Sequence, residues 1–209
     1  MTGIISDNVG RTSGLIKAAS GGGGVWTKIK TLTASSDSTL SFVDGSDDVT
    51  LDSTYPIYVF KFINIHPATT QPFLFQASTD GGSTYATTVT STAFRAYHKE
   101  DDSATTLSYD TGSDLAESTS FQDLHGNLTS TGNDQGGCGS LHLFNPSSTT
   151  YVKHFISKVS GDLDGSFAQV QYIAGYFNTT SAIDAVQFKM NADEIDAGKI
   201  KLYGLKDSA

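Results

Sequence analysis

The stretch Ile195-Asp-Ala-Gly-Lys-Ile-Lys-Leu-Tyr-Gly204 decides the fold class of this chain. Apolar residues recur at about every second position in it and in the run before it: Ile183, Ala185, Phe188, Ile200 and Leu202. This alternation is typical of strands that turn one face to a core and the other to water. Asp196-Ala-Gly198 stands between the two runs, and glycine adopts a positive φ without steric cost. The pattern therefore predicts two strands joined by a tight turn at this tripeptide.

Shorter runs of the same kind fill most of the chain, separated by turn signals such as Asp80-Gly-Gly82. Residues 57–65 are almost continuously apolar, which predicts a central strand. Short strands with frequent turns indicate a sandwich or a barrel. We expect an all-β fold, an antiparallel, jelly-roll-like β-sandwich of about ten strands, with the last strand beside the first. No window predicts a helix, apart from a short turn near Asp123.

The chain divides into an arm and one domain. Residues 25–209 suit a single β-sandwich domain, because all-β domains of this length are common. Residues 1–24 form an extended arm that ends in the flexible hinge Gly21–Gly24. The apolar residues of the arm have no core of their own, so we expect them to dock on a neighbouring protein. These partner-docking residues are Ile4, Ile5, Val9, Leu15 and Ile16.

A second unusual segment lies in the middle of the chain. Residues 99–137 are acidic, rich in glycine and serine, and only weakly periodic. This is long for a simple connection, and long loops on rigid scaffolds often carry function. We expect a functional excursion with short strands on the outer surface or at a subunit contact.

The net charge and the single cysteine indicate which classes of partner and which cellular compartment to expect. The net charge is −9 and the 13 Lys and Arg residues are scattered, which argues against nucleic acid and anionic membranes as partners. Cys138 is the only cysteine, so we expect a small buried hydrophobe, with an interchain bridge or a reactive thiol as alternatives. A disulfide-free fold suggests synthesis in a reducing cytoplasm. We expect no secretory signal and no membrane insertion, since the sequence shows neither pattern.

The aspartates offer only weak metal motifs. Asp162-Leu-Asp164-Gly165 resembles half of a calcium loop, but a third acidic ligand and the terminal Glu are missing. A second cluster comprises Asp44, Asp47 and Asp48. Aspartates in turns usually cap their own backbone, so we expect capping there and no metal site.

The remaining candidates for chemistry are equally sparse. The spacing of the five histidines along the sequence does not match that of metal ligands. We expect His142 and His154 to oppose each other across a hairpin. No Gly-x-Ser-x-Gly elbow is present, and Gly21–Gly24 precedes a strand instead of the helix that a phosphate loop requires. We therefore expect no catalytic residues, no cofactor and no enzyme. Five aromatic residues could pack in the core or stack on sugar rings: Trp26, Tyr97, Tyr109, Tyr172 and Tyr176.

Three stretches together resemble virion structural proteins of tailed bacteriophages, especially phages of aquatic bacteria. They are the arm Gly3–Lys17, the segment Ser78-Thr-Asp-Gly-Gly-Ser-Thr-Tyr85, and Leu141-His-Leu-Phe-Asn-Pro-Ser-Ser148 taken with Ile195–Gly204. Similar proteins often end in Ser-Gly-x-Ile-x-Ser-Gly-Thr-Ile-x-Leu-Tyr-Gly, from which Asp193-Glu194 and Asp196-Ala197 depart. The resemblance implies a β-sandwich, self-association and display on the virion surface after synthesis in the host cytoplasm.

Two functions from different classes follow. The first is a head decoration or cement protein, whose arm grips the capsid shell and stabilises it. The alternative is a short tail fibre or receptor-binding protein that contacts host surface glycan. A glycan depolymerase ranks third, because it would need a pair of carboxylates in a cleft. In each case we expect a homo-oligomer, a trimer, since homo-oligomers usually close by cyclic symmetry.

Overall fold

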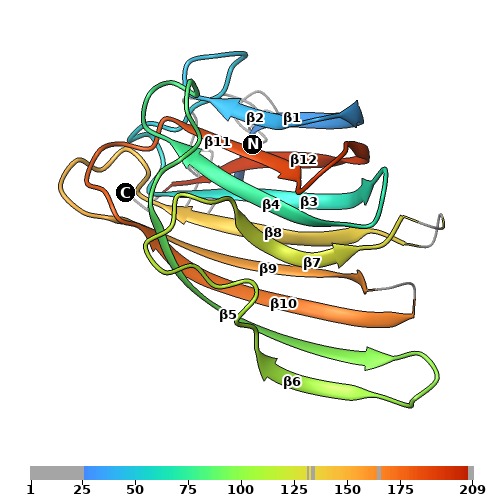
Figure 1. Cartoon of the computed structure of the whole chain (residues 1–209). Coiled ribbons are helices and arrows are strands. Elements are labelled where there is room, and N and C mark those ends of the chain that lie inside the picture. Colours follow the sequence, from blue (N-terminus) through green and yellow to red (C-terminus); the bar gives the residue numbers. More distant parts are fainter. Residues whose placement is uncertain (1–25, 131, 133–134, 164–165, 207–209) are drawn as a thin grey trace, which may run out of the picture.

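The computed structural model describes residues 26–130, 132, 135–163 and 166–206 of the chain. These residues form twelve β-strands and no helix (Figure 1). The predicted all-β class is therefore confirmed. The expected arm and its docking residues lie outside the described residues.

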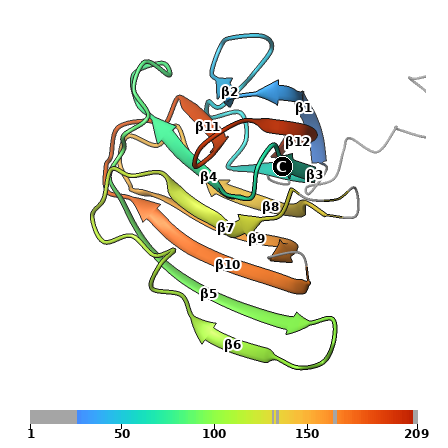
Figure 2. The same cartoon turned by 45° about the vertical axis from the view of Figure 1, so that its right-hand side comes forward.

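The strands are β1 (Trp26–Asp37), β2 (Leu40–Val43), β3 (Ile57–Pro67), β4 (Gln71–Ser78), β5 (Val89–Lys99), β6 (Thr105–Tyr109), β7 (Gln122–Leu128), β8 (Gly137–Phe144), β9 (Lys153–Leu163), β10 (Phe167–Phe177), β11 (Ala185–Met190) and β12 (Ile195–Leu205). They pair antiparallel in the order β1-β12-β3-β8-β9-β7-β4-β11-β2, and β10, β5 and β6 branch from β9. The link between β7 and β9 is the single pair Leu128–Leu163. The sheet curls until it nearly closes into a barrel, with β6 at the end opposite β1 and β2 (Figure 2).

The prediction that the last strand lies beside the first is confirmed. β12 pairs with β1 from Trp26–Leu205 to Asp37–Ile195. β3 lies between β12 and β8, and its consecutive residues Tyr58, Val59 and Phe60 are all buried. Successive side chains of a strand point to opposite faces, so β3 is covered on both sides, as its apolar sequence predicts.

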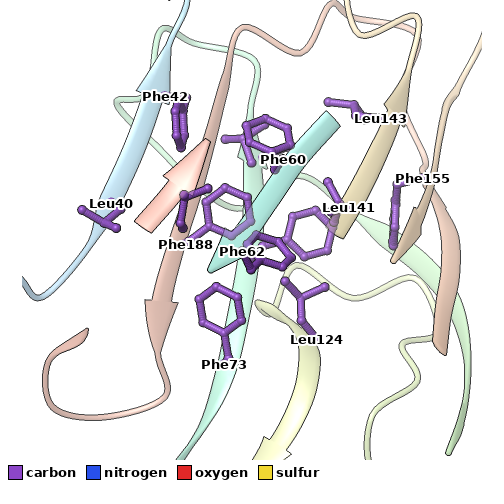
Figure 3. Close-up of a cluster of buried hydrophobic side chains, with 14 of the residues drawn as sticks. Leu40, Phe42, Phe60, Phe62, Phe73, Leu124, Leu141, Leu143, Phe155 and Phe188 are labelled. Carbon is purple, nitrogen blue, oxygen red and sulfur yellow. The ribbon is translucent and has the colours of Figure 1, made fainter. Parts of the chain in front are cut away.

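Aromatic side chains fill the space between the two sides of the curled sheet. Five phenylalanine rings surround Phe188 of β11 at centroid distances of 5.2 to 6.2 Å: Phe42, Phe60, Phe62, Phe73 and Phe75. Figure 3 shows several of these rings gathered with Leu124 and Leu141. Full burial of such a side chain stabilises the fold by roughly 1.5–3 kcal/mol. This cluster therefore joins strands that are not hydrogen-bonded to each other.

The predicted turn at Asp196–Gly198 is wrong, because these residues lie inside β12. The pairing of β12 with β3 shifts register on both sides of Ala197, which marks β-bulges. Gly198 has a φ of 123°, and a Cβ there would lie 2.5 Å from the carbonyl oxygen of Asn64. A bulge thus demands the same glycine that a turn would. The chain actually turns just before Ile195.

The middle segment is not an outer excursion throughout. Its strand β7 pairs with β4, and Leu124 and Leu128 are fully buried. This also overturns the short turn near Asp123, which lies in β7. β6 is different, because β5 is its only partner among the described strands and its alternate residues are exposed. One part of residues 99–137 therefore builds the core, and another part forms the edge of the sheet.

No helix of the described residues is long and apolar enough to cross a membrane.

Candidate functional site

The outward face of β9, β10, β5 and β6 carries large apolar side chains that none of the described strands covers. On β9 the alternation is complete: Phe155 is 1% exposed, whereas its neighbour Ile156 is 51% exposed. Leu107 and Tyr109 of β6 and Phe94 of β5 are also exposed. We name this region the outer aromatic surface: Phe94, Leu107, Tyr109, Ile156, Lys158 and Tyr172. Contiguous exposed apolar surface commonly marks an interaction site.

The register of the sheet places four of these side chains in one row. Tyr109 pairs with Phe94, Phe94 with Tyr172, and Tyr172 with Lys158. The rings of Phe94 and Tyr172 stack at 4.8 Å between centroids, and the Lys158 Nζ lies 5.4 Å from the Tyr172 centroid. Cross-strand aromatic pairs and cation–π contacts each contribute about 0.5–1 kcal/mol. The row is therefore an ordered platform.

A shallow apolar groove continues the outer aromatic surface along β5, β9 and β10. It has a volume of about 420 Å³, and its lining includes Thr90, Thr92, His154, Ile156, Gly175 and Tyr176. Its outward-facing lining residues Thr90, Thr92 and Ala174 are small, which leaves a depression between the larger Ile156 and Tyr176. The rings of His154 and Tyr176 lie 5.6 Å apart at one side.

A polar cleft adjoins the apolar groove at the end of β10. It has a volume of about 440 Å³ and is lined by Thr79, Asp80, Thr84, Ala86, Thr87, Thr88, Asn178 and Thr179. The cleft lies where the pairing of β5 with β10 continues beyond the ends of both strands, because the Asn178 N–H donates to the Thr88 carbonyl at 2.8 Å. The side-chain oxygen Oδ1 of Asn178 is buried and has no hydrogen-bond partner among the described residues. Hydrogen bonds from Ser78 and Thr84 lower the pKa of the exposed Asp80 carboxyl, which is therefore ionised at neutral pH.

Beneath this face, a buried polar network holds the loop after β6 against β5 and β10. The Arg95 Nη1 lies 3.6 Å from Asp110 Oδ2. The Ser113 hydroxyl lies 3.1 Å from that same oxygen and 3.3 Å from Asp123 Oδ2, so one hydroxyl serves two carboxyls. Burial raises the pKa of Asp123 to about 7 and lowers the pKa of His125 to about 4. At neutral pH His125 is uncharged.

Cys138 is exposed, so its expected burial as a small hydrophobe is wrong. Side chains alternate along β8, and Gly137 and Leu141 face the core, so residue 138 points outward. Its sulfur accepts the Asn64 N–H at 3.3 Å in a cavity that also contains His66 and Asp196. His66 does not act on the thiol, because its Nε2 bonds to the Gly132 carbonyl and its Nδ1 lies 3.9 Å from Asp196 Oδ2.

The metal candidates do not assemble. Asp44 caps its turn, as expected, because its Oδ1 accepts the Leu51 N–H at 2.8 Å. Asp162 accepts the N–H of Phe167, while residues 164–165 of the half calcium loop lie outside the described residues. Across the parts of the chain that the structure describes, no three His, Cys, Asp or Glu residues are placed to hold a metal ion.

The expected opposition of His142 and His154 is wrong, since His142 pairs with Ile156. The five predicted aromatics divide between two faces. Tyr109, Tyr172 and Tyr176 belong to the outward face, whereas Tyr97 packs edge-on against Phe167, 5.2 Å away. Trp26 lies at the far end of the sheet against Tyr203, under the Lys61 ammonium. The sequence reasoning missed Phe94, Leu107, Ile156 and Asn178, although apolar residues on both phases of β5 and β10 signal a strand with two apolar faces.

No protein-family model, curated protein or solved structure gives a significant match to the chain.

Proposed function

We propose that this chain is a non-enzymatic virion structural protein, a head decoration or cement protein that stabilises the capsid. The observation that carries the proposal is the outer aromatic surface, where Phe94, Leu107 and Ile156 remain exposed on ordered strands. A protein that works alone in water gains nothing from this exposure, whereas a protein that binds a larger assembly gains apolar contact area. The partners in this proposal are further copies of the chain, as a homotrimer, and other virion proteins.

We also propose that the curled sheet is a jelly-roll-like β-sandwich with an extended N-terminal arm. Contacts between the rings of Phe60 on β3 and Phe188 on β11, and of Phe75 on β4 and Phe155 on β9, support two facing layers. The arm would add Ile4, Ile5, Val9, Leu15 and Ile16 as docking residues. An arm loses conformational entropy only when it docks, so its contacts contribute only in the assembled particle.

In this mechanism, stabilisation comes from apolar area removed from water at the capsid contact. Such burial contributes roughly 25 cal/mol per Å² before the costs of association and ordering. The arm and the outer aromatic surface are two separate regions that can supply it. The protein would then lie on the virion surface after its synthesis in the host cytoplasm.

The test is incorporation of variants into virions. Changing Ile4, Ile5, Leu15 and Ile16 together to Ser should leave the domain folded and abolish incorporation. Changing Phe94 and Leu107 to Ser should weaken incorporation, whereas Ile63→Ser on β3 serves as a matched control because Ile63 is exposed away from the outer aromatic surface. If the fourfold arm variant and the Phe94 and Leu107 double variant were both incorporated normally, the decoration function would be refuted.

A second candidate function is a short tail fibre or receptor-binding protein that contacts host surface glycan. The polar cleft beside the apolar groove favours it, because binding sites for small polar ligands combine apolar walls with a few polar groups. The number of copies per virion separates the two functions. A decoration protein covers the head in many copies, and a fibre is present in few.

A further inference from the structure

We propose that the polar cleft and Tyr176 together form a binding site for a neutral hexose unit of an oligosaccharide. This inference deepens the second candidate function and does not depend on the decoration function. It rests on the juxtaposition of two cavities of different chemistry on one pair of strands.

The two cavities follow each other along the chain at the end of the β5–β10 pair. Asn178 of the polar cleft follows Tyr176 of the apolar groove by two residues, and Thr88 precedes Thr90 by the same interval. Tyr176 pairs with Thr90. Two residues further toward the cleft, the Asn178 N–H donates to the Thr88 carbonyl. Alternate residues of a strand share a face, so Tyr176 and Thr90 lie on the outward side, and Thr88 and Asn178 continue this pairing just beyond the strand ends. A ligand can therefore touch the aromatic ring and the polar groups at once.

The chemistry of the lining matches a hexose. A pyranose ring has an apolar C–H face that packs on an aromatic ring, and a rim of hydroxyls that need hydrogen-bond partners. Tyr176 offers the ring, while Thr88 and Asp80 offer polar groups at the other side. The small side chains of Thr90, Thr92 and Ala174 keep the groove between the cleft and Ile156 low. An elongated ligand can therefore extend from the cleft toward the outer aromatic surface.

Asn178 supplies an independent indication of a ligand. Its Oδ1 is buried without a partner, which is unfavourable for a polar atom by about 1–3 kcal/mol. Turning the amide toward the polar cleft breaks no hydrogen bond of that oxygen. A ligand hydroxyl that donates to Oδ1 would then satisfy the group.

The charge of the cleft selects among sugars. Asp80 is ionised and exposed at the mouth of the polar cleft. The Lys153 ammonium cannot bind a ligand anion directly, because it is buried and donates to the carbonyls of Tyr151 and Thr179. A carboxylate repels sulfated, phosphorylated and sialylated sugars. The site therefore favours uncharged hexoses.

The test is titration of the full chain with maltohexaose, mannohexaose and galactohexaose, followed by amide NMR shifts. At least one of them should shift the amides of residues 84–90 and 176–179. Asn178→Ala and Tyr176→Ala should each weaken that affinity by roughly tenfold, and Tyr176→Phe should restore most of it. Sialyllactose should bind less tightly than the neutral sugars, and Asp80→Asn should reduce this difference.

Two results would overturn the inference: none of the three neutral oligosaccharides shifts these amides, or both alanine variants bind as tightly as the wild type. Ile63→Ala serves as the control, since Ile63 is exposed on β3 and lines neither cavity. If the neutral sugars shift only amides around Phe94, the site assignment fails while a glycan-binding function survives. If no sugar binds but the Phe94 and Leu107 variants lose incorporation into virions, only the decoration function stands.

Discussion

Phe94 and Tyr172 stack face to face on the outside of the protein, with their ring planes 8° apart. They are direct cross-strand partners of β5 and β10, so the sheet itself fixes their spacing. Phe94 remains 44% exposed in this pair. A hydrophobic pair that is rigid and still exposed is prepared for contact, because binding would require little further ordering of its side chains.

Replacing Phe94 and Leu107 by Ser should reduce self-association without unfolding the domain. Both residues are exposed, so the free energy of unfolding should fall by only about 1 kcal/mol. Sedimentation velocity should show a shift from oligomer to monomer. An unchanged oligomer would place the self-association interface elsewhere.

Phe188→Ala should be among the most damaging single changes in the chain. Phe188 is fully buried among five other rings, and removal of such a side chain costs about 3–5 kcal/mol. Urea unfolding measures the loss. Leu107→Ala is the comparison, because Leu107 is 75% exposed and its change should stay within about 0.5 kcal/mol. Similar losses for both variants would contradict the described core.

Gly175→Ala should destabilise the protein by about 1–3 kcal/mol, because the new side chain would point toward the buried Phe155 ring. The new Cβ would lie 2.7 Å from the Thr90 oxygen, which is backbone and cannot move alone. Gly112→Ala is the matched control, since a Cβ at Gly112 would lie an ordinary 3.5 Å from Asp110 Oδ1. Thermal unfolding of the two variants distinguishes a packing effect from a general cost of losing glycine.

Asp123 and His125 should give opposite pH dependences of stability. The folded-state pKa of Asp123 is raised to about 7 from 3.8, so its contribution is present below pH 4 and is lost as the pH rises to 7. The folded-state pKa of His125 is lowered to about 4 from 6.5, so its contribution is present above pH 6.5 and is lost as the pH falls to 4. The two effects offset each other in the wild type.

Single substitutions should expose each effect. Asp123→Asn should make the protein gain stability, relative to the wild type, as the pH rises from 4 to 7. His125→Gln should make it lose stability over the same rise. Each unit of pKa shift corresponds to about 1.4 kcal/mol. Chemical unfolding at several pH values tests this, and parallel curves for the two variants would disprove the assignment.

Cys138 should react fully with a thiol reagent in the folded protein, because its side chain is exposed. Cys138→Ser should change the free energy of unfolding by about 0.5 kcal/mol or less. A thiol that reacts only after denaturation would contradict the position of Cys138 on the outward face of β8.

The sequence was sufficient for the strand pattern and its centre, and insufficient for the roles of particular residues. The apolar run 57–65 predicted β3 because burial on both faces requires it. Asp196–Gly198 was misassigned because a turn and a bulge both need a glycine at positive φ, and only the partner Asn64 distinguishes them. Leu124 and Leu128 did not predict β7, because two apolar residues do not establish a period.

The candidate site was harder to predict, for a related reason. Tyr172 and Tyr176 could be named as possible sugar platforms, but their exposure depends on which strands cover β10. Phe94 and Ile156 are chemically the same as core residues, and only the tertiary structure shows that nothing in the described chain covers them. Asn178 gave no signal, because its unpaired oxygen results from packing.

The edge strands β1 and β6 have different consequences for handling the protein. β1 carries Lys28 and Lys30 among its residues, whereas β6, Thr105-Thr-Leu-Ser-Tyr109, has no charge and pairs only with β5. An uncharged edge with free backbone donors and acceptors is a template for indiscriminate strand addition. Concentrated solutions should therefore aggregate through β6 first, and Leu107→Lys should keep the isolated protein monodisperse.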